Sequence, residues 1–345
     1  MTDSTTPRVL VVGAGSIGMI FGHNLTLAHA DVTYLVRPGR VEHLSRLQTL
    51  YCYEDNSLKH FEGYSVISDH ADIAKGQFDY ILVTLDGASL QNEDGVKLVK
   101  AIGKAVQGTE TKVLQGAMFV ESRQWFKETS GLGDDQFTNA YFAIIAYSPS
   151  AVTLPLHGKT DAVLLAKADL AYSDKMDAGI FIADTVPVIA QGFAKLYDAS
   201  GVSKAAIVPG DFFAMYADAM FAMFGGCELL GWPKFADIDP SDETWRLGIA
   251  AMKEVQALAI HGEAGAKAAE DTTEAGVLKD QVATEKLMRP LDIQEFNRFH
   301  HGGKVNKQDR AILADSLAAG KAEGKEMVAL TELLHRLESE VASEK

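Results

Sequence analysis

Three glycines near the start of the chain have a spacing that suits the binding of a phosphate group. They follow the apolar residues 9–12 in the pattern G-x-G-x-x-G, and apolar residues continue beyond them at helical spacing. The first permits a tight strand-to-helix turn, the second lets a pyrophosphate approach the backbone, and the third lets helix and strand pack closely. We therefore predict a dinucleotide site on exposed backbone amides at the positive end of the helix dipole, formed by Gly13, Ala14, Gly15, Ser16, Ile17 and Gly18.

The residues after the next predicted strand indicate which dinucleotide is bound. Residues 31–36 are predicted to form that strand, and Arg37 and Arg40 follow it. An NAD site usually has an acidic residue there, ~20 residues past the glycines, to hold the ribose 2′-hydroxyl. A guanidinium instead suits a 2′-phosphate. We predict NADP(H) rather than NAD(H); the alternative is that both arginines are solvated loop residues.

Composition narrows the class of protein. The chain has 345 residues, 47% of them hydrophobic, and a net charge of −15. That charge argues against a nucleic-acid partner and against an anionic membrane surface. No apolar run approaches 18 residues, and residues 1–7 have no apolar signal core. Cys52 and Cys227 show no metal-ligand spacing, so we expect reduced thiols, no metal site and a cytoplasmic protein.

The order of predicted elements indicates an α/β fold followed by an all-helical part. Strands and helices alternate up to about residue 200, which predicts a doubly wound, largely parallel sheet with antiparallel strands late. We expect a nucleotide-binding domain of the Rossmann type over 1–200 and a helical substrate and dimerisation domain over 201–345. Ligands bind at the carboxyl ends of the strands, so Leu85, Gln115 and Gly116 join the predicted cofactor site.

Several elements are predicted more locally. Residues 47–58 are expected to form a hairpin, 87–106 a single helix, 139–146 and 162–167 strands, and 176–199 a helix. In the second part, helices are expected over 212–226, 241–261, 308–320 and 326–340. Two more are expected within 280–301, with a break at Pro290.

Several stretches together resemble the ketopantoate reductase family. They are GAGSIG, VTYLVRPGR, VEHL, FDYILVTL and VLQG, and RPLDIQEFNRFHHGGKV looks like a family stretch in the second domain. The resemblance implies an NADP-binding Rossmann domain, a helical domain resembling that of 6-phosphogluconate dehydrogenase, and reduction of 2-oxo acids by NADPH. It also implies that Asp292 and Asn297 match family positions that bind substrate.

Three positions depart from the family pattern. Asp86 stands where a lysine usually follows the strand, and Gln115-Gly116-Ala117 replaces Gln-Asn-Gly. No lysine lies between Lys204 and Lys234, where the family has its catalytic lysine. Ketone reduction needs a group that polarises the carbonyl and supplies a proton. We therefore expect a substrate other than ketopantoate, whose carboxylate would meet Asp86.

Three residues are candidates to replace the lysine as catalytic groups. Asp218 lies in an apolar run, where an acid must be paired, neutral or facing a cleft. Tyr216 on the same predicted helix is the second, although it could equally be a core aromatic. The third is His300 in HHGGK; the alternative there is a helix end capped by a left-handed Gly302.

These observations predict an NADPH-dependent oxidoreductase that acts on a small carbonyl or hydroxy compound. The alternative is a catalytically silent NADP-binding protein, such as a sensor or scaffold, because three expected polar groups are absent. Apolar helices in the second domain could pair two subunits into a homodimer, or could fill one core.

Overall fold

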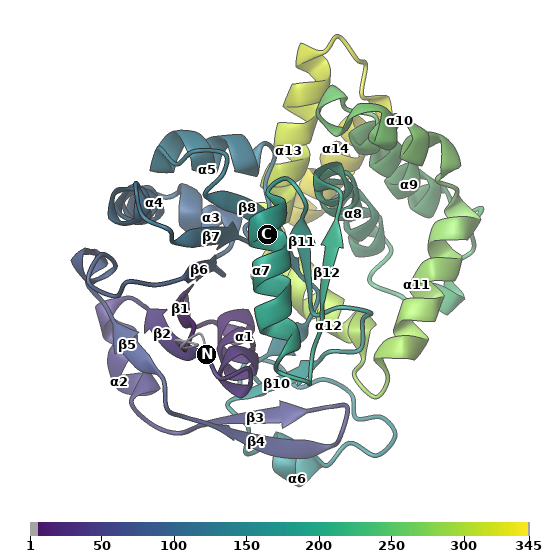
Figure 1. Cartoon of the computed structure of the whole chain (residues 1–345). Coiled ribbons are helices and arrows are strands. Elements are labelled where there is room, and N and C mark those ends of the chain that lie inside the picture. Colours follow the sequence, from purple (N-terminus) through teal and green to yellow (C-terminus); the bar gives the residue numbers. More distant parts are fainter. Residues whose placement is uncertain (1–5, 344–345) are drawn as a thin grey trace. The chain divides into compact units, whose positions relative to one another are not determined.

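The chain folds into two compact units (Figure 1). In the computed structural model residues 6–343 are described, apart from the side chains of 211–214 and 340–343. Unit 1 comprises Met1–Ala117, Glu121–Thr153 and Lys159–Pro209. Unit 2 comprises Met118–Val120, Leu154–Gly158 and Gly210–Lys345. Unit 1 contains the strands described below, and unit 2 contains the long helices of the C-terminal part.

An eight-stranded sheet forms the centre of unit 1, in the order β12-β11-β8-β7-β6-β1-β2-β5. All neighbours are parallel except β8 and β11. This confirms the predicted α/β class with a late antiparallel strand. The strands are β1 Arg8–Val12, β2 Asp31–Leu35, β5 Ser65–Ile67, β6 Tyr80–Val83, β7 Lys112–Gln115, β8 Phe137–Phe142, β11 Ile180–Ala183 and β12 Ala205–Val208.

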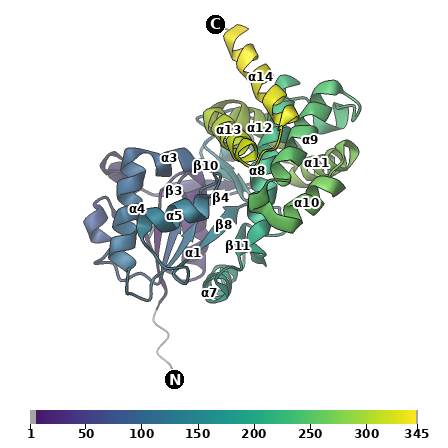
Figure 2. The same ribbon diagram turned by 90° about the horizontal axis from the view of Figure 1, so that it is seen from above.

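Seven α-helices accompany this sheet in the described part of unit 1, and α3, α4 and α5 lie together in both views (Figure 2). Helix α1 is different, because its residues 18–25 are all buried. A helix that is apolar on every side must be covered on every side, and α1 shares one core cluster with residues of both sheets and of α7. The helices are α1 Ser16–Leu27, α2 Val41–Leu44, α3 Gly87–Gln91, α4 Glu93–Val106, α5 Ser122–Ser130, α6 Ala162–Leu165 and α7 Pro187–Asp198.

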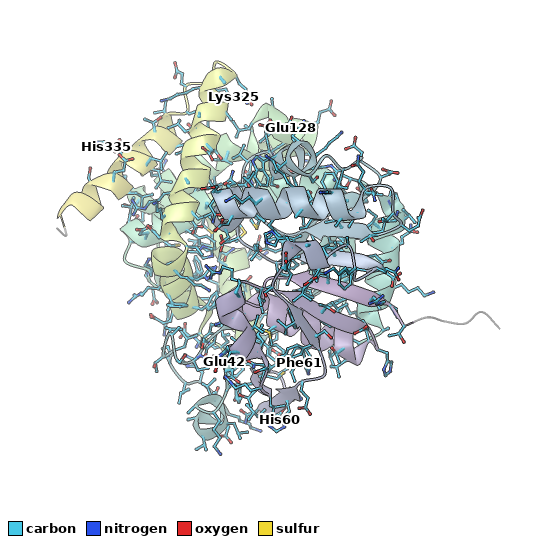
Figure 3. The ribbon with its side chains drawn as sticks, turned by 90° about the vertical axis from the view of Figure 1, so that its left-hand side faces the viewer. Glu42, His60, Phe61, Glu128, Lys325 and His335 are labelled. Atoms are coloured by element: carbon cyan, nitrogen blue, oxygen red, sulfur yellow. The ribbon has the colours of Figure 1, made fainter. Side chains whose placement is uncertain are left out.

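A second sheet, in the order β4-β3-β10-β9, belongs to the same unit. Its strands are β3 Gln48–Cys52, β4 Ser57–Phe61, β9 Ile145–Tyr147 and β10 Leu170–Ser173. The predicted hairpin is confirmed, since β3 and β4 pair antiparallel. On β4, Phe61 is buried and packs edge-on against Tyr34 of β2, whereas its neighbour His60 is exposed (Figure 3).

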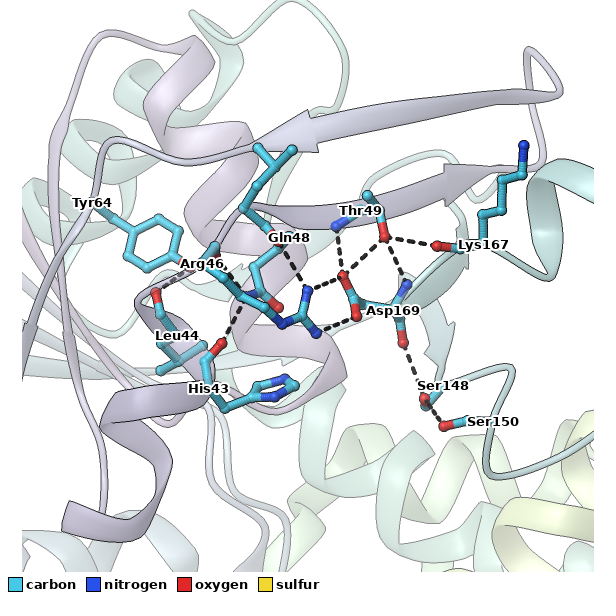
Figure 4. Close-up of polar contacts among 11 residues, drawn as sticks. His43, Leu44, Arg46, Gln48, Thr49, Tyr64, Ser148, Ser150, Lys167 and Asp169 are labelled. Carbon is cyan, nitrogen blue, oxygen red and sulfur yellow. Dashed lines mark hydrogen bonds and ion pairs between the residues drawn. The ribbon is translucent and has the colours of Figure 1, made fainter.

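An ion pair joins the two distant segments of this second sheet (Figure 4). Both guanidinium nitrogens of Arg46 bind Asp169, at 3.0 and 2.5 Å, and the amide and hydroxyl of Thr49 donate to the same carboxylate. Burial alone would raise the pKa of Asp169, but these hydrogen bonds outweigh it and lower the pKa to about 2. The carboxylate is therefore charged whenever the protein is folded near neutral pH.

Four sequence predictions in unit 1 are wrong, and in each case a local feature explains why. Residues 87–106 form two helices, because Asn92 ends α3 and caps α4 through the amides of residues 94 and 95. Residues 139–146 are divided between β8 and β9, which belong to different sheets. Residues 162–167 begin with α6, capped by Asp161, and 176–199 contain β11 before α7, which begins at Pro187.

Unit 2 is helical, as expected. Its helices are α8 Gly210–Leu229, α9 Glu243–Gln256, α10 Gly262–Asp271, α11 Glu274–Met288, α12 Ile293–Phe299, α13 Asn306–Ala322 and α14 Val328–Ser343. The break at Pro290 is confirmed, since α11 ends before it and α12 begins after it. Helices α8 and α9 pack closely where Gly226 meets Gly248; a Cβ on Gly248 would lie 3.2 Å from the Cα of Gly226. Helix α10 was not predicted.

The HHGGK stretch is not a helix end capped by glycine. Residues His300–Lys304 form a π-helical turn, in which the amide of Val305 donates to the carbonyl of His300 at 2.8 Å. Gly302 is not among the glycines with positive φ. Its small size is needed instead by Trp232, whose Nε1 would lie 2.8 Å from a Cβ at that position. None of the helices in the described part of the chain is long and apolar enough to cross a membrane.

Candidate functional site

The glycine turn lies at the carboxyl edge of the central sheet, between β1 and α1. Gly13 has φ +100°, a conformation that glycine adopts without strain. A Cβ on Gly18 would lie 2.1 Å from the carbonyl oxygen of Gly13, so only glycine lets α1 pack this closely on the turn. A Cβ on Gly15, by contrast, would meet no atom within 4 Å. The first and third glycines thus serve the fold, and the second faces open space.

The open space at Gly15 is bordered by hydrogen-bond donors. Gly15 is the N-cap of α1, and no side chain caps the helix there. The first amides of a helix have no partner within the helix, and its dipole favours an anion at this end. The amides of Ser16, Ile17 and Gly18 start the helix here. The residues present therefore fit a bound pyrophosphate.

Two further loops lie beside this turn. The hydroxyl of Thr84 donates to the carbonyls of Val12 and Gly13, at 3.0 and 3.1 Å, so the residues after β6 are fixed against the turn. Leu85 follows, with its Cδ2 2.8 Å from where a Cβ of Gly13 would lie. The amide of Gly116, after β7, donates to the carbonyl of Val83.

Gln115 has an unusual environment at the same edge. Its side chain is fully buried, and its Oε1 accepts a hydrogen bond from the amide of Ala117. Its Nε2 is buried without a hydrogen-bond partner. A buried donor that lacks a partner costs stability, which is consistent with a group that a ligand completes. Gly116 allows Phe142 to approach, because a Cβ there would lie 2.1 Å from the Phe142 ring.

The two predicted cofactor arginines lie just past β2. The amide of Gly13 donates to the carbonyl of Leu35, so the end of β2 is next to the glycine turn. Arg37 comes two residues later, and both Arg37 and Arg40 are exposed. Neither guanidinium forms an ion pair with a side chain that the structure describes. Both remain able to bind a phosphate.

Asp86 has a defined structural role in unit 1. It is the N-cap of α3, and its carboxylate accepts a hydrogen bond from the amide of Ser89 at 2.7 Å. The side chain is exposed and adds negative charge just after Leu85. Whether it also contacts a substrate stays a prediction.

The substrate residues expected from the resemblance lie at the start of α12 in unit 2. Asp292 caps this helix, and its Oδ2 is 2.7 Å from Nε2 of His157 and 3.2 Å from Arg289. Burial alone would raise the pKa of Asp292, but these partners lower it. Asn297 is buried one turn later and donates to Gln294 at 3.5 Å. Substrate binding by Asp292 and Asn297 stays a prediction.

Two of the three catalytic candidates lie on α8. Asp218 is buried, and burial raises the pKa of its carboxyl to about 7. It is therefore close to half protonated at neutral pH. Tyr216 is 44% exposed, so it is not the core aromatic of the alternative interpretation. The two side chains differ in environment although they are two residues apart.

The third candidate, His300, lies in the π-helical turn with its ring stacked on Phe296 at 5.2 Å. Its neighbour His301 makes the stronger polar contact: Nδ1 is 2.8 Å from Oδ2 of Asp309. Asp309 was not a candidate in the sequence. Residues 301 and 309 would be ~12 Å apart along a regular helix, and nothing in the sequence indicates the π-helical turn between them.

Comparison with known proteins agrees with this fold and this turn. Residues 9–114 match the family model of ketopantoate reductase PanE/ApbA. This confirms the resemblance over β1 to β7, the part of unit 1 that carries the glycine turn. No curated protein matches the sequence significantly.

Solved structures extend the likeness to both units, at the level of the fold. The 2-dehydropantoate 2-reductase of Geobacter metallireducens has a TM-score of 0.65 and 16% identity, and the alignment covers 96% of this chain and 99% of that one. The enzyme from Methylococcus capsulatus gives 0.64, 15%, 98% and 98%. A D-mandelate dehydrogenase in complex with NADH gives 0.63, 12%, 97% and 99%. The ketopantoate reductase fold therefore extends over nearly the whole chain.

Proposed function

We propose that this protein is an NADPH-dependent oxidoreductase that interconverts a small carbonyl compound and its alcohol. The observation that carries the proposal is the glycine turn: Gly15 borders open space at an uncapped helix N-terminus. The family match over residues 9–114 supports it, because that family is named for a reductase. When bound, a nicotinamide cofactor supplies or accepts a hydride.

The choice of NADP(H) over NAD(H) rests on Arg37 and Arg40. Both are exposed just past β2, and no acidic residue occupies the stretch VRPGR. A guanidinium binds a 2′-phosphate through paired hydrogen bonds and is a poor partner for a ribose hydroxyl. The D-mandelate dehydrogenase structure contains NADH, so the fold alone does not decide between the two cofactors.

We infer a substrate other than ketopantoate. Helix α8 contains no lysine or arginine, so it offers no cation to a carbonyl oxygen or a substrate carboxylate. The loop after β6 presents the exposed carboxylate of Asp86, which would repel an acid. A neutral ketone, a diketone or an aldehyde fits these charges better than a 2-oxo acid.

Cofactor binding can be tested separately from turnover. Titration of the protein's fluorescence with NADPH and with NADH should show tighter binding of NADPH, and Arg37→Asp should abolish the difference. Arg246→Asp, an exposed residue of α9, makes the same change of charge far along the chain and should leave the preference intact. Equal affinity of the starting protein for both nucleotides would contradict the role of Arg37.

Turnover distinguishes this proposal from a silent NADP-binding protein. The oxidation of NADPH should be followed with ketopantoate, phenylglyoxylate, 2,3-butanedione and benzaldehyde as probes. We expect turnover of a neutral carbonyl at a higher kcat/KM than that of ketopantoate. Tight NADPH binding without turnover of any probe would favour the silent protein, and efficient turnover of ketopantoate would contradict the interpretation of Asp86.

Two further properties belong to this proposal. A ketopantoate reductase from Staphylococcus aureus with the same fold is described as dimeric, at a TM-score of 0.57, and we propose a homodimer here, to be checked by light scattering. The thiols of Cys52 and Cys227 are both free and buried, which supports the expected cytoplasmic location.

A further inference from the structure

The π-helical turn His300–Lys304 directs one histidine ring onto α8. Single π-helical turns inside helices frequently occur at functional sites. Here the turn separates α12 from α13, and the ring of His301 stacks on Phe224 of α8 with 4.0 Å between the ring centres. Phe221, one turn earlier on α8, meets the same ring at 6.2 Å. Three aromatic contacts, including one with His300, fix the plane of the imidazole.

A buried carboxyl group determines which ring nitrogen of His301 is available. Nδ1 is 2.8 Å from Oδ2 of Asp309, whose side chain is only 8% exposed. The His301 side chain keeps 16% of its surface exposed. Because Nδ1 is engaged, Nε2 is the nitrogen that can meet a substrate. This is the geometry of an imidazole oriented by a carboxyl group for proton transfer.

The charges around the pair leave it electrically neutral. Arg310 is the next residue after Asp309, but its guanidinium binds Glu228 of α8 at 2.6 Å and the carbonyl of Leu337 at 2.7 Å. Oδ1 of Asp309 is buried without a partner. Glu228 therefore contributes a negative charge near Asp309, while its own arginine is held away from the pair.

Burial then determines where the proton resides. It raises the pKa of Asp309 to about 8, helped by the repulsion from Glu228, and it lowers the pKa of His301 to about 3. Near neutral pH the pair thus holds one transferable proton, with the carboxyl donating to Nδ1 and the imidazole carrying hydrogen on Nε2. Other titratable groups close by are His300, against the His301 ring, and Asp218, one turn before Phe221 on α8.

We propose that His301 is the catalytic proton donor of this enzyme, with Asp309 as the residue that positions it and replenishes its proton. The proposal rests on the oxidoreductase function proposed above and assigns to this pair the task that a lysine of α8 would otherwise perform. It replaces His300, the neighbouring candidate from the sequence, whose ring stacks on Phe296.

The step balances without a further reagent. As a hydride reaches the carbonyl carbon, the C=O electron pair moves to oxygen, and that oxygen takes the proton from Nε2 of His301. The carboxyl proton of Asp309 passes to Nδ1, so that the imidazole stays neutral and Asp309 becomes a carboxylate. A proton from water restores the carboxyl group, and oxidation of the alcohol runs through the same transfers in reverse.

The test compares two substitutions with two matched controls. His301→Gln removes the imidazole, and Asp309→Asn keeps a hydrogen-bond donor to Nδ1 but removes the transferable proton. Asp315→Asn is the same change at an exposed position of α13, and His335→Gln lies on the exposed side of α14 (Figure 3). Far-UV circular dichroism and NADPH titration show whether each variant folds and binds the cofactor.

The expected result is a loss of kcat at unchanged NADPH affinity, with the best carbonyl probe as substrate. General acid catalysis contributes ~10²–10⁴-fold, so His301→Gln should lose that factor. In the wild type, the reduction rate should fall above pH ~8, because Asp309 has then lost its proton. Asp309→Asn should be slower at neutral pH and should lack this fall, and both controls should behave as wild type.

A second measurement does not depend on turnover. Imidazole ¹⁵N resonances of the enzyme without substrate should show one histidine that responds to a titration near pH 8, absent in His301→Gln and unresponsive in Asp309→Asn. A folded His301→Gln variant with wild-type kcat, or no such resonance, would overturn the proposal while leaving the oxidoreductase function intact. A wild type that turns over no probe would contradict both.

Discussion

The two glycines Gly15 and Gly18 offer a sharp test, because the same substitution should affect ligand binding at one and folding at the other. A Cβ on Gly18 would lie 2.1 Å from the carbonyl oxygen of Gly13 and 2.7 Å from Oγ1 of Thr84. The first of these atoms is backbone and cannot rotate away. A Cβ on Gly15 would meet nothing within 4 Å, and its φ of −77° is accessible to alanine.

These distances give magnitudes. Overpacking a well-packed site costs ~1–3 kcal/mol, and we expect Gly18→Ala at the upper end because backbone must move. With a urea m-value of ~3 kcal/mol/M, the unfolding midpoint should fall by about 1 M. Gly15→Ala should change the free energy of unfolding by less than ~0.5 kcal/mol, because no native contact is disturbed. Its new methyl group instead occupies the approach of the pyrophosphate.

The cost to binding follows from the amides at the start of α1. A hydrogen bond to a charged group contributes ~1.5–3 kcal/mol, so losing one such bond should weaken NADPH binding roughly 10- to 100-fold. Urea unfolding followed by far-UV circular dichroism and fluorescence titration with NADPH measure both quantities. Wild-type NADPH affinity in folded Gly15→Ala would refute the assignment of this turn as the cofactor site.

Three further variants test the fold and its charges. Burial raises the pKa of Asp218 to about 7 from 3.8, so wild-type stability should fall as pH rises from about 4 to 7; urea unfolding at pH 5 and 8 should show a drop smaller by a few kcal/mol in Asp218→Asn, and equal drops would contradict this. Gly302→Ala would place a Cβ 2.8 Å from Nε1 of Trp232 and should cost ~1–3 kcal/mol in thermal unfolding, whereas Gly303→Ala, with nothing within 4 Å, is its control; similar losses in both would refute the packing explanation. Asp169→Asn should cost ~1–2 kcal/mol at pH 7, and because the wild-type pKa is lowered to about 2, this difference should disappear as pH falls from about 4 to 2; a difference unchanged at pH 2 would argue against the ion pair.

The sequence predicted those features that depend on a few neighbouring residues. The turn at Gly13, Gly15 and Gly18 needs only local sterics, and each glycine has the surroundings that its position in the motif suggests. The helices of unit 2 followed from apolar periodicity. Periodicity alone failed where a cap decides: Asn92 divides residues 87–106, and Asp161 turns an apolar run into α6.

The candidate site in unit 2 was harder to predict, for a different reason. The sequence indicated a buried acid at position 218, since Asp218 is flanked by apolar residues. It did not indicate that His301 and Asp309 meet, because a regular helix would place them ~12 Å apart. A π-helical turn depends on packing, here on Trp232 against Gly302, and packing between distant segments cannot be deduced from spacing.

The pairing of β3 with β10 has a consequence for any attempt to produce a smaller version of this protein. A fragment that stops at residue 114 would keep β3 and most of β7 but lose β10 and β8, their outer partners. Two rows of unpaired backbone amides and carbonyls would then be presented to other chains, and such exposed strand edges promote aggregation. The segment that carries the nucleotide motif is thus not a portable module, and about a hundred residues of later sequence must be synthesised before its edges are covered.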